Sequence, residues 1–167
     1  RLDVVTDGAQ RLEVLRSIAQ IYEEKMDDAF EAIAGWRSVL DESPEDPAAI
    51  AALDRLFTRE SMHVELLENL GLQKRIVQDQ AMWVDLGVRI GRLKETELAD
   101  LEGAIESYRD VLAQQPTHPE AIEALERLAR DETVREQAIG VLEPLHREAG
   151  RADRLAEILE LKLELME

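Results

Sequence analysis

Hydrophobic residues recur every three or four positions along almost the whole chain, and short turns rich in Asp, Pro and Gly separate the runs. This spacing puts the apolar side chains on one face of a helix. It therefore predicts an all-α protein of about nine helices. The expected helices cover residues 9–26, 29–42, 47–58, 61–78, 80–94, 100–114, 119–130, 133–150 and 151–167.

One segment of this pattern occurs twice. Residues 32–56 and 104–128 align without a gap at an offset of 72 residues, and thirteen positions carry the same residue. Trp36 recurs as Tyr108, so the aromatic position is kept. Repetition at a fixed period indicates stacked structural units. We therefore expect the chain to repeat both its helices and its turns.

The offset divides the chain into units 7–78 and 79–150, with a third beginning at 151–167, all within one repeat domain over 1–167. Helix 151–167 has more apolar surface than one neighbouring helix covers, and residues 1–5 resemble the tail of a helix. Exposed apolar patches normally mark an interface. We expect a segment of a longer array, with self-association through helix 151–167 as the alternative.

Side chains that accept hydrogen bonds stand at the predicted helix starts. Asp7, Asp28 and Asp46 are expected to cap the helices that follow them, because a carboxylate accepts from the free N–H groups of the first turn. Ser61 and Thr133 are expected to cap the fourth and eighth helices, Thr133 through a capping box.

Large apolar residues are expected to pack between helices. Phe30 and Trp36 lie on the apolar face of the second helix, and Trp83 and Tyr108 occupy similar positions later. Aromatic residues at such positions usually fill a core. Gly91, one turn after Gly87, flattens a face on which helix 100–114 is expected to dock through Tyr108.

The second unit resembles the tetratricopeptide repeat family. The motif W-x2-L-G-x2-I starts at Trp83, A-x3-Y starts at Ala104, and Pro116 follows. The family signature is W-x2-L-G-x2-Y, A-x3-F and P over ~34 residues. The resemblance implies an α-α superhelix, a TPR-like solenoid of helical repeats. Here the repeat is a double unit of 72 residues, and the first unit matches the signature less well.

The composition limits the partners. The chain has 37 acidic and 20 basic residues, so its net charge is −17. An acidic surface repels phosphate backbones, so we expect no nucleic-acid partner, and a basic protein or peptide fits better. The alternative is that the acidic residues only form a solvated surface. No apolar run is long enough to span a membrane.

No motif indicates catalysis. The chain has no cysteine, which excludes disulfides and thiolate chemistry. His63, His118 and His146 are scattered and form no H-E-x-x-H motif, so we expect surface or capping histidines rather than metal ligands. We expect no catalytic residue, no metal and no cofactor.

Binding residues follow from the resemblance. In the family the first helix of each pair lines a concave groove. The corresponding candidates here are Arg16, Gln20, Arg55, Arg92, Glu123 and Arg127. Arginine at such a position can bind a peptide carboxylate. The alternative, that Arg55 and Arg127 only bridge neighbouring acids, stays open.

These observations favour a non-enzymatic scaffold that binds a protein or peptide on a helical surface, because repeat arrays usually present binding surfaces. A module that assembles by stacking its ends on other copies is the alternative. A hydrolase or metal enzyme has no supporting motif. The composition leaves the compartment open, and we expect the cytoplasm.

Overall fold

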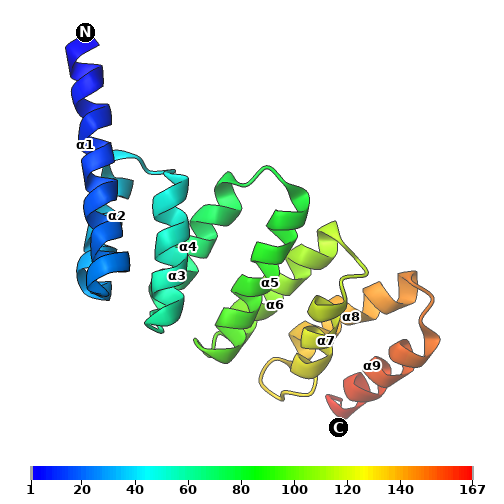
Figure 1. Cartoon of the computed structure of the whole chain (residues 1–167). Coiled ribbons are helices and arrows are strands. Elements are labelled where there is room, and N and C mark those ends of the chain that lie inside the picture. The colour runs from blue at the N-terminus through cyan, green and yellow to red at the C-terminus, as the bar shows by residue number, and fades with distance from the viewer. Residues whose placement is uncertain (1, 167) are drawn as a thin grey trace. The chain divides into compact units, whose positions relative to one another are not determined.

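All regular structure in the described part of the chain is helical. The computed structural model describes residues 2–166, with side chains from Asp7 onward, and it contains nine α-helices, one π-helical segment and no strand there (Figure 1). The predicted all-α class and the number of helices are confirmed. Arg1 and Glu167, which belonged to the predicted terminal elements, lie outside the described residues.

The chain divides after Ile76 into two compact units. Unit 1 contains α1 (Leu2–Ile21), the π-helix η1 (Tyr22–Met26), α2 (Ala29–Glu42), α3 (Pro47–Arg59) and α4 (His63–Ile76). Each helix packs against the next one in the chain. The interior is aliphatic, with Trp36 and Phe57 as its buried aromatic residues.

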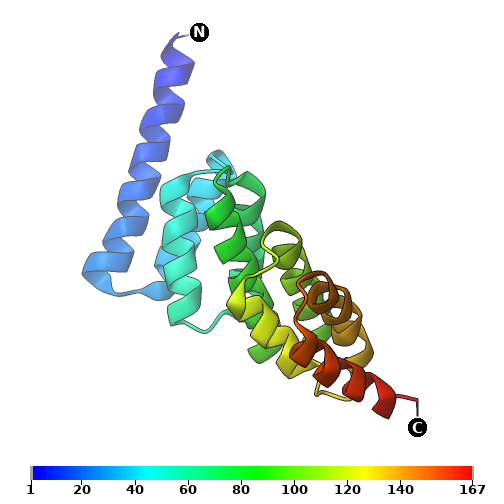
Figure 2. The same ribbon diagram turned by 90° about the vertical axis from the view of Figure 1, so that its right-hand side faces the viewer.

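Unit 2 contains α5 (Gln80–Thr96), α6 (Leu101–Gln114), α7 (Pro119–Leu128), α8 (Arg135–Glu148) and α9 (Ala152–Glu164). Consecutive helices are again neighbours, and α6 also contacts α8. Helix α9 lies beside α8 in both views (Figures 1 and 2). One continuous apolar core joins α5 to α9, with Tyr108 buried in it.

The local backbone recurs at the offset of the sequence repeat. Helices α2 and α6 each have 14 residues and begin 72 residues apart. Ser43 and Gln115, which end these helices, have φ/ψ of −139°/88° and −137°/84°. Asp46 and His118 have −60°/113° and −63°/113°. The turns at Pro44 and Pro116 therefore have the same geometry, as the aligned segments predicted.

Two predicted caps are confirmed in unit 1. Asp28 Oδ1 accepts from the backbone N–H of Glu31 at 3.1 Å, and Asp46 Oδ1 accepts from Ala49 at 2.9 Å. Each bond satisfies a donor that the first helical turn leaves free. The caps fix where α2 and α3 begin.

The caps predicted at Ser61 and Thr133 are wrong. Helices α4 and α8 begin two residues later, and Ser61 adopts a left-handed conformation with φ of 55°. Thr133 Oγ1 instead bonds the Asp131 carboxylate, at 2.5 Å. Short polar side chains can form local hydrogen bonds instead of capping a helix. Ser61 and Thr133 both lie in the turns that precede these helices.

The predicted break near the N-terminus is also wrong. Helix α1 runs without interruption from Leu2 to Ile21, so residues 2–5 do not form the end of a separate helix and Asp7 lies inside α1. A Cβ on Gly8 would meet no atom within 4 Å. The corresponding Asp79 does cap α5, accepting from Met82 N–H at 2.8 Å.

Of the four aromatic residues expected in the core, Trp36 and Tyr108 are buried, Trp83 is half-buried and Phe30 is exposed. Trp36 and Tyr108 are 5% and 1% exposed, and Trp83 packs half-buried against the core. Phe30 is 80% exposed. It is the second residue of α2, and helical side chains point toward the N-terminus, so its ring extends past the start of the helix.

Small residues allow the first two helices of each unit to approach closely. A Cβ on Gly91 would lie 2.6 Å from Tyr108 Cε1, and a Cβ on Gly35 would lie 2.9 Å from Ala19 Cβ. Ala19 and Gly91 occupy equivalent positions in the repeat. The predicted docking of α6 on α5 at Gly91 through Tyr108 is confirmed.

His146 was expected at the surface or at a cap, and it is fully buried in α8. Neither ring nitrogen has a hydrogen-bond partner, and Nε2 lies 3.5 Å from Glu126 Oε1. Burial lowers the pKa of His146; Arg151 and Arg154 act in the same direction, whereas Glu126 and Glu157 raise it. The folded protein therefore favours the neutral imidazole.

This burial predicts a loss of stability in acid. The folded pKa lies below the unfolded value of about 6.5, so the unfolded chain takes up the proton first as the pH falls. The free energy of unfolding should decrease below that pH. In urea titrations at neutral and acidic pH, His146→Leu should show a smaller decrease than the unmodified chain. Equal decreases in the two proteins would show that His146 does not contribute.

Candidate functional site

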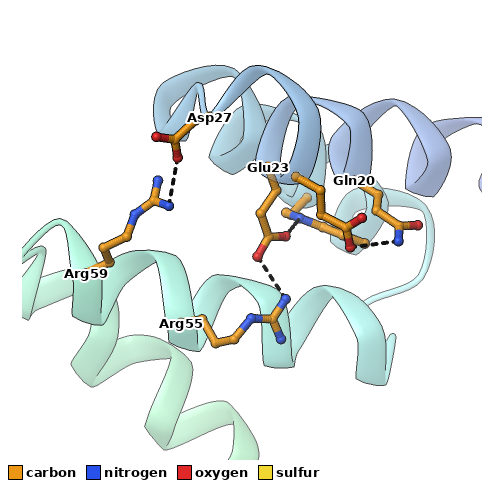
Figure 3. Close-up of polar contacts among 7 residues, drawn as sticks. Gln20, Glu23, Asp27, Arg55 and Arg59 are labelled. Carbon is orange, nitrogen blue, oxygen red and sulfur yellow. Dashed lines mark hydrogen bonds and ion pairs between the residues drawn. The ribbon is translucent and has the colours of Figure 1, made fainter.

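A carboxylate joins three elements of unit 1. Glu23, on η1, accepts a hydrogen bond from Trp36 Nε1 of α2 at 2.9 Å and another from Arg55 Nη2 of α3 at 2.9 Å. Figure 3 shows Arg55 reaching from α3 to Glu23, with Arg59 and Asp27 forming a second ion pair of 3.1 Å alongside. The Glu23–Arg55 ion pair thus connects η1 to α3.

The same arrangement occurs in unit 2, 72 residues later. Tyr108 Oη donates to Glu95 Oε2 at 2.9 Å, while Arg127 donates from Nε to Oε1 at 2.8 Å and from Nη2 to Oε2 at 3.0 Å. We call each set, Glu23–Trp36–Arg55 and Glu95–Tyr108–Arg127, a clasp. Burial, followed by the charge of Glu95, raises the pKa of Tyr108, so its hydroxyl remains a donor.

Unit 2 has a surface hollow of about 600 Å³ beside its clasp. We call it the groove. Its lining comes from α5, α6 and α7: Arg92, Thr96, Tyr108, Pro119, Glu120, Glu123, Ala124 and Arg127. Three of the six predicted binding residues, Arg92, Glu123 and Arg127, therefore meet in one hollow.

The predicted residues of unit 1 are engaged with neighbouring acids. Arg16 Nε donates to the buried carboxylate of Asp46 at 2.9 Å, and Gln20 donates to Glu24 at 2.9 Å. Burial tends to raise the pKa of Asp46, but Arg16 and backbone N–H groups outweigh it and the pKa is lowered. Gln20 lines a smaller hollow of about 220 Å³ with Ser17, Ile21, Glu24 and Lys25.

The candidate arginines all have partners within their own unit. Arg55 and Arg127 bridge to acids of the clasps, and Arg92 pairs with Glu120. The side chains of Arg92 and Glu120 are 59% and 45% exposed. Exposed ion pairs contribute only about 0–1 kcal/mol, so a charged ligand can replace one partner at little cost.

Sequence reasoning missed the acidic members of these contacts. Glu23, Glu95 and Glu120 were not candidates, although Glu23 and Glu95 stand at equivalent positions. Both lie upstream of the segment that repeats most clearly. Testing the offset for glutamate together with the aromatic residue and the arginine would have found the clasps.

Other kinds of site lack support in residues 2–166. Among the side chains described from Asp7 to Met166, no group of three or more His, Cys, Asp or Glu residues could hold a metal ion. None of the helices described there is both long and apolar enough to cross a membrane. No protein-family model matches the chain, and no curated protein matches it.

The clasp predicts a measurable coupling. Glu95→Gln keeps the shape of the side chain but removes the negative charge that Arg127 and Tyr108 contact. The free energy of unfolding should therefore fall by about 1.5–3 kcal/mol. Glu106→Gln, at an exposed position of α6, should change stability by less than about 0.5 kcal/mol.

Denaturant titration of Glu95→Gln, Arg127→Gln and the double variant gives the coupling directly. The loss of stability in the double variant should differ from the sum of the two single losses by about 0.5 kcal/mol or more. Strict additivity would mean that the Glu95–Arg127 contact contributes nothing to stability.

Proposed function

We propose that the chain is a TPR-like, non-enzymatic scaffold that binds a protein or peptide partner, with the groove of unit 2 as a contact site. The observation that supports this most is the convergence of Arg92, Glu123 and Arg127 on one hollow. These residues lie on α5 and α7, at positions that the family resemblance assigns to a binding surface.

The charges of the groove suit a polypeptide partner. Arg92 and Arg127 can bind carboxylates, while Glu120 and Glu123 can accept from basic side chains or backbone N–H groups. Rim charges of this kind set specificity and association rate more than affinity. The net charge of −17 attracts a partner that is basic overall.

Charge reversal in the groove tests the proposal. Glu123 is exposed and lines the groove, whereas Glu106 is exposed on α6 outside it, so Glu123→Lys and Glu106→Lys carry the same change at different places. Partners captured from an extract of the source cells by the unmodified chain are identified by mass spectrometry, then measured in purified form.

We expect Glu106→Lys to retain the partner and Glu123→Lys to bind it about tenfold more weakly, equivalent to about 1.4 kcal/mol. Affinity for the unmodified chain should fall with added salt. Equal affinities of the two variants for every captured partner would exclude the groove as the binding site.

A second candidate function, self-assembly through stacked ends, is favoured by exposed apolar side chains. On α9, Ile158 is buried while Leu159 and Leu163 are exposed. On α1, Val14 and Ile18 are exposed, although their repeat counterparts Leu86 and Ile90 are buried. Two different apolar faces on one chain suit head-to-tail contacts between copies.

If the chain self-assembles, its average molecular mass in solution should rise with protein concentration. Leu159→Glu should reduce the increase measured by light scattering, because it places a charge in the apolar contact. Val64→Glu makes the same kind of change at an exposed apolar position of α4 and should have no effect. An unmodified chain that remains monomeric at high concentration would rule out this candidate.

A further inference from the structure

Unit 1 has a second hollow, of about 240 Å³, between α2, α3 and α4. We call it the α2–α4 pocket. Its apolar lining is Leu40, Leu53, Phe57 and Leu72, and its polar lining is Arg37, Glu65, Glu68, Asn69 and Arg75. Leu53 and Phe57 are buried, whereas Leu40 and Leu72 are half-buried and present apolar surface. None of the six predicted binding residues belongs to it.

The charges around this pocket are unpaired, unlike those of the groove. Among the described side chains, Arg37 and Arg75 form no hydrogen bond or ion pair, and the same holds for Glu65 and Glu68. Two arginines therefore line this pocket without a bonded acidic partner. Their donors remain available to a ligand.

Arg37 is held in position by an aromatic ring. Its Cζ lies 5.5 Å from the centroid of the Phe57 ring. A guanidinium stacked on an aromatic face keeps its in-plane N–H donors free for a carboxylate. Arg37 therefore loses little side-chain entropy when it binds one, while Arg75 approaches the same pocket from α4.

The pocket is specific to unit 1. The repeat counterpart of Phe57 is Ala129, so the counterpart of Arg37, which is Arg109, has no ring beneath it at that position. The counterpart of Arg75 is Arg147, which donates to Glu143 at 2.7 Å. The ring beneath Arg37 and the arginine of α4 without an acidic partner are therefore features of unit 1 alone.

We propose that the α2–α4 pocket binds a bulky apolar residue of a partner peptide, with an acidic side chain next to it on Arg37 and Arg75. A basic residue on its other side contacts Glu65 and Glu68, which stand one turn apart on α4. The site rests on the proposed function only in taking a polypeptide ligand. It shares no residue with the groove, so either site can stand without the other.

Short peptides test this chemistry directly. The probe is the acetylated and amidated pentapeptide Gly-Glu-Phe-Lys-Gly, titrated into the isotopically labelled chain and followed by NMR. Two comparison peptides replace Glu and Lys by Gln, or Phe by Ala. We expect each replacement to weaken binding about fivefold, as for an exposed ion pair or a lost apolar contact.

Variants of the chain locate the site. Arg37→Gln should weaken binding of the charged peptide about fivefold and leave binding of the Gln-substituted peptide unchanged. Arg109→Gln, the same change at the equivalent exposed position of unit 2, should affect neither. Phe57→Leu keeps an apolar floor but removes the stacking, so it should weaken the charged peptide while thermal unfolding confirms that the variant folds.

Glu123→Lys distinguishes binding at the α2–α4 pocket from binding at the groove. Because Glu123 lines only the groove, this change should leave pentapeptide binding unchanged. The proposal would be overturned if none of the peptides bound, if the charged and Gln-substituted peptides bound equally, or if Arg37→Gln and Arg109→Gln had equal effects.

Discussion

A carboxylate that is largely removed from water must be paired, and in this protein that constraint organises both units. Glu23 and Glu95 are 14% and 10% exposed, and each accepts hydrogen bonds from an aromatic residue and an arginine on two other helices. Losing one partner would leave a poorly solvated charge, which is costly. The clasps therefore hold the first, second and third helices of each unit in one arrangement.

The clasps also determine which charges are free to bind other molecules. Arg55 and Arg127 point over exposed surfaces, yet each already neutralises an acid. A ligand carboxylate at the proposed groove would therefore exchange one ion pair for another. At the α2–α4 pocket, Arg37 and Arg75 have no ion pair to break. The two proposed sites therefore differ in the electrostatic cost that a carboxylate ligand would meet, and the cost is lower at the pocket.

Local sequence rules predicted the features that depend on few residues. The spacing of apolar residues predicted the helices, and Asp28 and Asp46 marked two of their starts. Features that depend on distant neighbours were missed. The burial of His146 depends on how α7, α8 and α9 pack, and the Glu23–Arg55 contact spans 32 residues. Neither can be derived without knowing which helix faces meet.

The two units share the clasp but differ at other buried positions. Trp36 and Tyr108 occupy equivalent places in the clasp because each provides one donor to the equivalent glutamate. Phe57 and Ala129 are both buried, although they differ greatly in volume. Unit 1 therefore has a ring beneath Arg37 that unit 2 lacks at the equivalent position, while both units keep the clasp. The proposed pocket thus depends on a difference between the two units, whereas the proposed groove uses an arginine of the clasp that both units share.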